Sequence, residues 1–183
     1  MPTLVQEFPF DLQKSCLHIL VSECKRGCRC VDAGLAETKV VVFRVGKEEY
    51  AVSISAVQEV GPWSQPTPVP EAPPMVEGVI NLRGEIIPVM DLGRLFKTGR
   101  LKELSDSKTI VMEVDGHRAG FVVDDVTEVQ TISPGDVAPP SPVLRAGSQA
   151  GAMVSGIIKM GENRLVVLVD SRRILAFARL AAV

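Results

Sequence analysis

The chain contains one block of sequence twice, and this repeat limits the possible folds more than any other feature. Residues 41–60 align without a gap on residues 110–129, and residues 78–96 align on residues 156–175 with one extra residue at a turn. The two pairs of segments occur in the same order, which indicates two related subdomains. Matching pairs include Val42/Val111, Val45/Val114, Val57/Val126, Glu59/Glu128 and Val60/Val129.

Short Val- and Ile-rich runs follow one another from Lys39 onward, separated by Gly, Asp, Asn or Pro. This pattern predicts an all-β barrel or sandwich rather than alternating βαβ units. Asp115-Gly116 lies between two such runs and predicts a two-residue hairpin, whose twist matches that of its strands. The predicted strands are 41–45, 49–54, 78–82, 85–90, 108–114, 118–123, 154–160 and 164–169.

Two short helices are predicted by the same start signal. Asp91 precedes residues 92–96, and Asp170 precedes residues 171–175. The carboxylate of each Asp can accept hydrogen bonds from the free N–H groups of the first helical turn. Each helix offers apolar residues at helical spacing, so we expect each to cover the end of a barrel.

Two Pro-rich stretches, residues 62–74 and 134–142, occupy equivalent positions in the repeat. We therefore expect ordered crossovers between barrel strands rather than a domain linker, although a polyproline ligand for an aromatic groove of a partner is an alternative. The small, polar segment 144–153 is predicted to be a mobile loop.

The charge and hydropathy patterns exclude several classes of partner. The formal net charge is −2 and no Lys/Arg cluster is present, which argues against nucleic acid or an anionic membrane as a partner. The apolar stretch at residues 16–21 is too short to span a bilayer and lacks the flanks of a signal peptide. We expect a cytoplasmic protein.

All four cysteines lie in the first 30 residues. Their C-x3-C-x-C spacing fits no common zinc motif, and thiols stay reduced in a cytoplasm. We predict an N-terminal extension without a metal site, and a zinc site with His18 as a further ligand is the weaker alternative. The cysteines are Cys16, Cys24, Cys28 and Cys30.

A catalytic constellation is not found in the sequence. His117 follows the predicted hairpin turn, where a solvated imidazole is expected, and no phosphate-binding or nucleophile-elbow glycine pattern occurs. Asp124 and Asp125 are adjacent, so in a strand their side chains would point to opposite faces. We expect them to end a strand and cap the turn at Val126-Thr127. These observations predict a protein without enzymatic activity or a cofactor, which works by binding other proteins.

The stretch GVINLRGEIIPVMDL at residues 78–92 predicts a tight hairpin, because Gly84 between two apolar runs accepts a positive φ at no steric cost. The equivalent second-half stretch has Gly161 opposite Arg83, so the fold does not require an Arg at this turn. Arg83 is thus a candidate recognition residue, and its structural alternative is a surface ion pair with Glu85 or Glu77.

Three segments resemble the CheW family, the adaptors that couple chemoreceptors to the histidine kinase CheA: EEYAVSISAVQEV (48–60), GVINLRGEIIPVMDL (78–92) and GFVVDDVTEVQTI (120–132). The resemblance implies an all-β fold of two intertwined five-stranded SH3-like β-barrels with short capping helices, and no catalysis. It divides the chain into an extension at 1–38 that matches nothing in the family pattern, a CheW-like domain at 39–178 and a tail at 179–183. For the extension, the alternatives are a disordered segment, a short helix or the result of too early a start codon.

The resemblance also implies the partners. One surface would hold the cytoplasmic tip of a chemoreceptor and others the regulatory domain of CheA, in arrays beneath the inner membrane, and the kinase-contact residues are unknown. Alternatives are an adaptor of a pilus-linked or other chemosensory pathway, a small ligand-binding β-barrel, and an enzyme centred on the Cys-containing extension.

The receptor groove of the family lies between the subdomains, and its residues carry over onto seven positions of this chain. An apolar seam with one Arg at its rim suits a helix-in-groove contact. Each position also has a structural explanation: valines in the core, a solvated glutamate, an asparagine that shapes the turn and a glycine that serves as a hinge. The seven are Val57, Glu59, Gly78, Asn81, Arg83, Val126 and Val129.

Overall fold

The computed structural model describes residues 37–140, 149–161 and 163–181, so the four cysteines and His18 lie outside the described residues. The chain begins with β1 (Thr38–Val45), β2 (Glu48–Ser53), β3 (Val57–Pro62), β4 (Val76–Leu82), β5 (Glu85–Asp91) and α2 (Leu92–Phe96). It continues with β6 (Lys108–Val114), β7 (His117–Val123), β8 (Asp125–Ile132), β9 (Val137–Ala138), α4 (Gln149–Met153), β10 (Val154–Met160), β11 (Arg164–Val169) and α5 (Ser171–Ala181). Single 3₁₀ turns cover Ile54–Ala56, Leu104–Asp106 and Pro134–Asp136.

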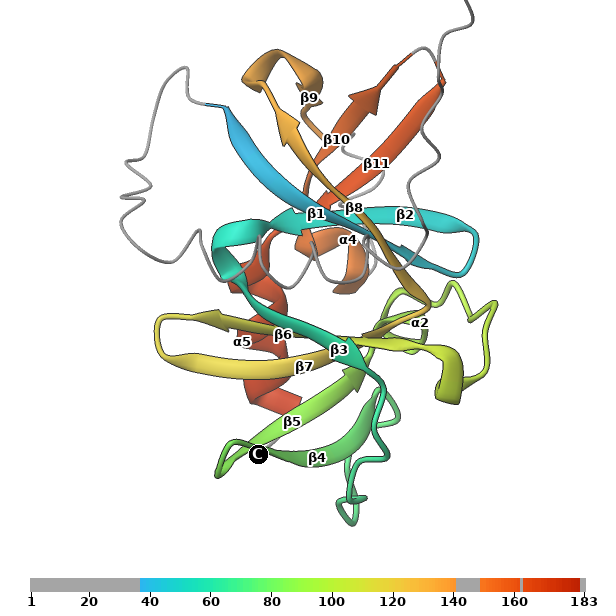
Figure 1. The fold of residues 1–183 in the computed structure, drawn as a ribbon, viewed down its shortest axis with the longest axis vertical. Helices are drawn as coiled ribbons and strands as arrows, with labels where there is room; N and C mark the ends of the chain where they lie inside the picture. The colour runs from blue at the N-terminus through green and yellow to red at the C-terminus, as the bar shows by residue number, and fades with distance from the viewer. Residues whose placement is uncertain (1–36, 141–148, 162, 182–183) are drawn as a thin grey trace, which may run out of the picture.

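Two sheets form the molecule, and each takes strands from both halves of the repeat (Figure 1). Sheet A has the order β8-β1-β2-β11-β10-β9, and sheet B has the order β3-β6-β7-β5-β4. Sheet A joins β1 and β2 of the first half to β8–β11 of the second half, and sheet B joins β6 and β7 of the second half to β3–β5 of the first half. The exchanged strands include β3, which pairs with β6, and β8, which pairs with β1. The prediction of two intertwined β subdomains is therefore confirmed, and sheet A has a sixth strand, the two-residue β9.

All eight predicted strands are present, and β6, β10 and β11 begin and end where the sequence indicates. The exchanged strands β3 and β8 were not among the predicted strands, because a β-bulge interrupts the alternation of side chains in each. The bulges leave Gln58 and Thr127 without a register partner, and these two residues are equivalent in the repeat. Apolar residues three apart, such as Val57 and Val60, can consequently face the same core.

The first Pro-rich stretch is tied to sheet B. Thr67 forms an isolated bridge with Val79, with N–O distances of 2.8 and 2.9 Å in the two hydrogen bonds. In the second half, Ala138 of β9 pairs with Ile157 of β10, at the repeat-equivalent position. The first crossover is thus ordered, as predicted.

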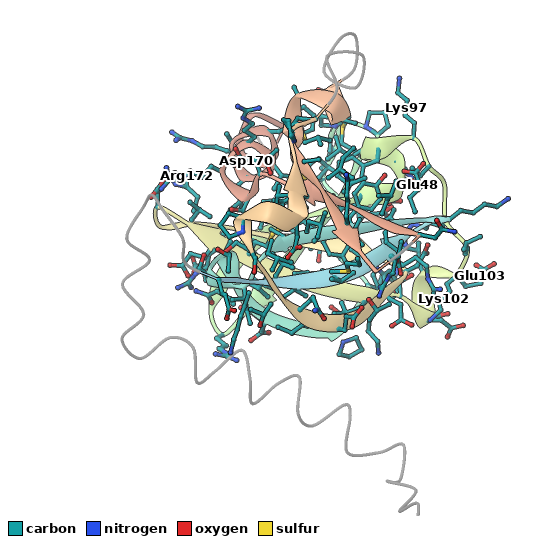
Figure 2. All side chains as sticks on the ribbon, turned by 90° about the horizontal axis from the view of Figure 1, so that it is seen from above. Glu48, Lys97, Lys102, Glu103, Asp170 and Arg172 are labelled. Atoms are coloured by element: carbon teal, nitrogen blue, oxygen red, sulfur yellow. The ribbon has the colours of Figure 1, made fainter. Side chains whose placement is uncertain are left out.

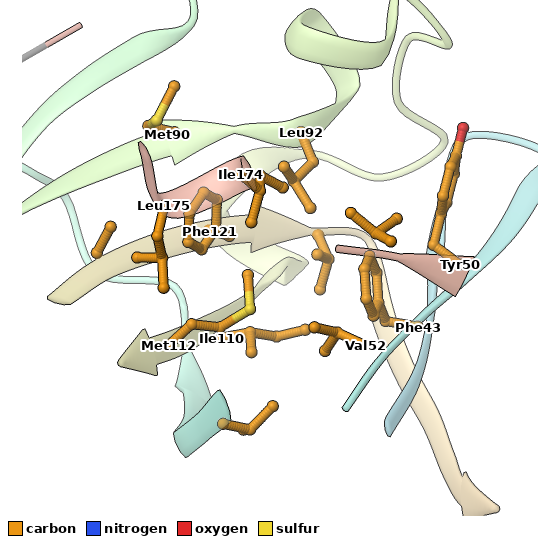
Figure 3. Packing of buried hydrophobic residues seen from close by; sticks show 14 of the residues in the cluster. Phe43, Tyr50, Val52, Met90, Leu92, Ile110, Met112, Phe121, Ile174 and Leu175 are labelled. Carbon is orange, nitrogen blue, oxygen red and sulfur yellow. The ribbon is translucent and has the colours of Figure 1, made fainter. Parts of the chain in front are cut away.

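The main core lies between the sheets and contains residues of both (Figure 3). Phe43 and Val52 of sheet A meet Ile110 and Phe121 of sheet B there. A smaller cluster, which includes Val42, lies on the other face of β1. Because the middle of β1 is buried on both faces, residues 40–43 form a continuous apolar run without alternation.

Both predicted helix caps are present. Asp91 Oδ1 accepts hydrogen bonds from the backbone N–H groups of Gly93 (2.7 Å) and Arg94 (3.2 Å). Asp170 Oδ1 accepts hydrogen bonds from the N–H groups of Arg172 (2.9 Å) and Arg173 (3.3 Å). The helix α5 follows β11 of sheet A but contacts β6 and β7 of sheet B, so it connects the two sheets (Figure 1).

Three expectations need correction. Residues 149–153, predicted as part of a mobile loop, form α4, and α5 continues to Ala181, beyond the short helix predicted at 171–175. Asp124 does not cap the turn that follows it. Its buried carboxylate accepts hydrogen bonds from the backbone N–H groups of Gly46 (2.6 Å) and Leu101 (3.2 Å), and so it holds two loops together.

Among the residues that the structure describes, no helix is long and apolar enough to cross a membrane.

Candidate functional site

Arg83 lies in the two-residue turn between β4 and β5, where Leu82 pairs with Glu85. Both turn residues have positive φ, 53° for Arg83 and 90° for Gly84. Asn81 Oδ1 accepts a hydrogen bond from the Gly84 N–H at 2.8 Å, which explains one role of Asn81. The equivalent residue Gly161 has a φ of 62°, so this position is left-handed in both halves. A side chain here costs about 1–2 kcal/mol that glycine avoids.

The guanidinium of Arg83 pairs with Glu59, with an Nη2–Oε2 distance of 2.6 Å. The two predicted alternative partners are occupied elsewhere: Glu85 pairs with Arg118, and Glu77 pairs with Arg94. The side chain of Arg83 is 78% exposed and that of Glu59 is 21% exposed. Most of the guanidinium is therefore open to solvent, although its carboxylate partner is fixed against the protein.

This ion pair connects the two edges of sheet B. Glu59 is on β3, and Arg83 follows β4, the strand at the opposite end of the order β3-β6-β7-β5-β4. A sheet whose end strands are joined in this way curves towards a closed barrel. An exposed pair of this kind contributes roughly 0.2–1 kcal/mol, so it supports the closure weakly.

In sheet A, the equivalent glutamate pairs with a different arginine, which lies on an inner strand of the sheet. Arg164 on β11 pairs with Glu128 on β8 (2.5 Å), the repeat equivalent of Glu59, and with Glu49 on β2 (2.6 Å). Hydrogen bonds to Glu49 and Glu128 raise the pKa of Arg164. Its side chain is 41% exposed. Arg164 thus has two carboxylate partners, whereas Arg83 has one and is more exposed.

The repeat explains why the two halves differ. Arg164 aligns with Glu85 and Glu49 aligns with Arg118, so the Arg164–Glu49 pair and the Glu85–Arg118 pair are equivalent with exchanged charges. In sheet B, an acidic residue therefore stands where Arg164 stands in sheet A. Glu59 obtains its cation from the turn instead.

Gly78 has a structural role that its sequence position suggests. It is buried, has a φ of +145° and lies at a β-bulge between β4 and β5. A Cβ atom at this position would come within 2.2 Å of the carbonyl oxygen of Thr67. Gly78 therefore permits the close approach of the Pro-rich crossover to β4.

The three candidate valines differ in exposure. Val57 is 1% exposed and belongs to the core between the sheets. Val126 and Val129 on β8 are partly buried and pack against the same cluster. The structure thus brings the repeat-equivalent Val57 and Val126 to one cluster, and it leaves part of the surface of Val126 and Val129 accessible. Contact of any of the seven residues with a receptor stays a prediction.

Sequence reasoning missed the ion-pair network around this site. The charge exchange between Glu85 and Arg164 is visible in the alignment of the two halves, and it is the signal that could have identified Glu59 as the partner of Arg83. In the described part of the chain, no group of three or more His, Cys, Asp or Glu side chains could hold a metal ion. The alternative zinc site falls on residues that the structure does not describe.

Comparisons with known proteins agree with this architecture. Residues 39–179 match the CheW-like domain family. The chemotaxis protein CheW of Rhizobium meliloti is 33% identical over 132 residues, which cover 72% of this chain and 83% of the relative. Protein FrzA of Myxococcus xanthus is 30% identical over 148 residues, which cover 80% and 91%.

A solved structure is similar as well. The crystal structure of the scaffolding protein TtCheW from Thermoanaerobacter tengcongensis superposes with a TM-score of 0.66 at 38% sequence identity. The match covers 73% of this chain and 89% of that one. With the exchanged strands and the repeat, these matches show that the chain belongs to the CheW family of non-enzymatic chemotaxis adaptors.

Proposed function

We propose that this chain links the cytoplasmic tips of chemoreceptors to the regulatory domain of the histidine kinase CheA and helps to assemble the signalling array beneath the inner membrane. Membership of the CheW family supports this adaptor role over a small ligand-binding barrel. An adaptor of a pilus-linked or other alternative chemosensory pathway would use the same fold.

The proposed receptor surface rests on the backbone conformation and the exposure of Arg83. The residue occupies a left-handed position that favours glycine, and its side chain is 78% exposed with a single carboxylate partner. Arg is enriched among the residues that dominate binding energy, because its planar fork can hold carboxylates or carbonyl groups. Glu59 restricts the guanidinium before the partner arrives, which lowers the entropic cost of binding.

The other candidate residues take different parts in this surface. Asn81 is exposed beside the turn, and Val126 and Val129 offer partly exposed apolar area. Val57 and Gly78 are buried, so we propose that they support the surface from beneath rather than contact the receptor directly.

The proposal is tested by co-sedimentation with a receptor signalling fragment and with the regulatory domain of CheA. Arg83→Gly removes the guanidinium and suits the left-handed backbone, so the variant should keep or exceed wild-type stability. It should weaken receptor binding by about 2 kcal/mol or more, as expected for an interface anchor, which is roughly 30-fold. Arg83→Asp should weaken binding at least as much, since it places a second acid beside Glu59.

Lys159 aligns with Asn81 and is exposed on the other hairpin, so Lys159→Asp is the matched control for a change of charge. It should leave receptor binding within about twofold, because exposed charges outside an interface contribute little. If both Arg83 variants bind the receptor fragment with wild-type affinity, Arg83 is not part of the receptor surface. Failure of the wild-type chain to bind either partner would refute the adaptor function itself.

A further inference from the structure

A second surface lies outside the seven candidate receptor contacts. A cavity of about 710 Å³ opens between α5 and the hairpin that joins β6 to β7. None of the seven candidate residues lines it. Its walls are formed by Val114, Asp115, His117, Arg172, Leu175, Ala176 and Arg179.

The cations of this cavity are unusual for the molecule. Within the described residues, Arg172 and Arg179 are the only arginines whose side chains form no salt bridge. Both side chains are exposed, and Figure 2 shows Arg172 at the periphery of the molecule, on α5. The guanidinium groups of these two arginines are therefore available to pair with acidic groups of another molecule.

The geometry places the two cations on one side of a single rigid element. Arg172 and Arg179 are seven residues apart on α5, which is two helical turns or about 10 Å along the axis. Ala176 is exposed between them along the helix, beside the buried Leu175, and the partly buried Val114 adds apolar surface from the opposite wall. Asp115 is the one acidic residue in the lining, so the two arginines give the cavity a net positive charge.

We propose that this cavity docks an acidic, amphipathic segment of a partner protein, in which two carboxylates about 10 Å apart flank an apolar residue. The carboxylates would pair with Arg172 and Arg179, and the apolar residue would cover Ala176, which is exposed, and the accessible part of Val114. Charge-assisted pairs of this kind fix the register of a bound segment and increase its rate of association. A concave site with opposing walls fits a protein segment better than a flat lipid surface.

The test uses the full chain and a fluorescein-labelled, helix-forming peptide with two glutamates seven residues apart and two leucines between them. Fluorescence anisotropy should show saturable binding that weakens as salt is added. The same peptide with glutamines in place of the glutamates should bind at least about tenfold more weakly, as expected when two charged pairs are lost. The double variant R172E/R179E should lose binding to a similar extent.

The matched control is K47E/K159E, which makes the same change of net charge at two exposed lysines outside the cavity. If this control loses as much affinity as R172E/R179E, the binding reflects net charge and the proposal is overturned. Equal affinity for the glutamine peptide overturns it as well. Binding to phosphatidylglycerol vesicles that R172E/R179E abolishes, without peptide binding, would assign the cavity to a membrane surface instead.

Discussion

The substitution Gly78→Ala separates a structural role of this residue from a role in receptor contact. Gly78 is buried at a β-bulge with a φ of +145°, and the added Cβ would lie 2.2 Å from the Thr67 carbonyl oxygen. That atom belongs to the backbone and cannot rotate away. The crossover that carries Thr67 must therefore move, and its two hydrogen bonds with Val79 must lengthen or break.

The expected cost has two parts. A residue with a side chain in a region of φ and ψ that is nearly restricted to glycine costs about 1–3 kcal/mol. Two lost backbone hydrogen bonds cost about 0.5–1.5 kcal/mol each. Together they lower the free energy of unfolding by roughly 2–6 kcal/mol, which is a large share of the 5–15 kcal/mol that holds a typical domain folded.

Two other glycines provide controls. Gly61 has no positive φ and Gly84 has a φ of +90°, and a Cβ at either position meets nothing within 4 Å. Gly61→Ala should thus change stability by less than about 0.5 kcal/mol, and Gly84→Ala should show the backbone cost alone. Urea unfolding gives the free energies, provided that their dependence on urea concentration is the same in all variants. Hydrogen exchange of the Thr67 and Val79 amides reports whether the two hydrogen bonds between these residues remain. A Gly78→Ala variant as stable as Gly61→Ala, with both amides still protected, would refute this reasoning.

Two further predictions concern buried polar groups. Burial, the hydrogen bond to Glu48 and the negative charge of Glu48 raise the pKa of Tyr50 in the folded protein. As the pH rises, the unfolded chain should therefore lose the Tyr50 proton before the folded chain does. The free energy of unfolding should consequently fall as the pH rises above about 10. Tyr50→Phe should reduce that fall, and absorbance at the tyrosinate band can follow the group directly because it is the only tyrosine in the chain; equal pH dependence in both proteins would contradict the assignment. Asp124→Asn should destabilise by about 2–3 kcal/mol in urea unfolding, since hydrogen bonds from Gly46 and Leu101 lose their charged acceptor. Asp125→Asn should cost less than about 1 kcal/mol, because the half-buried Asp125 forms partly exposed ion pairs with Lys102 and Arg44. Equal stability of the two Asp variants would be inconsistent with the buried role of Asp124.

Much of the fold could be predicted from the sequence, because the signals were local. The hairpin at Asp115 and the caps at Asp91 and Asp170 depend on residues within a few positions of one another. The strands β3 and β8 were missed because their bulges place polar residues where an alternating pattern would put apolar ones. The exchange of these strands between halves depends on contacts distant in sequence, and only the resemblance to the CheW family indicated it.

The candidate site was predictable in its residue types but not in its contacts. The turn at Arg83 and the glycine at position 78 follow from sequence pattern, and their backbone conformations agree with it. The choice of Glu59 as the partner of Arg83 depends on how sheet B curves until its end strands meet. The burial of Val57 depends on the bulge beside it, which no residue type in β3 encodes clearly.

The two halves of the repeat differ in the stability cost of the residue at the equivalent turn position. At the equivalent turn position, Gly161 adopts the left-handed conformation without a penalty, whereas Arg83 accepts a cost of about 1–2 kcal/mol. The exposed pair with Glu59 returns about 1 kcal/mol at most, so stability alone gives no net reason for an arginine there. Sheet A shows the alternative, since Arg164 satisfies Glu128 from a strand position that requires no strained backbone. An arrangement without this backbone cost therefore exists within the same chain, which supports the proposal that the arginine at the β4–β5 turn serves binding rather than stability.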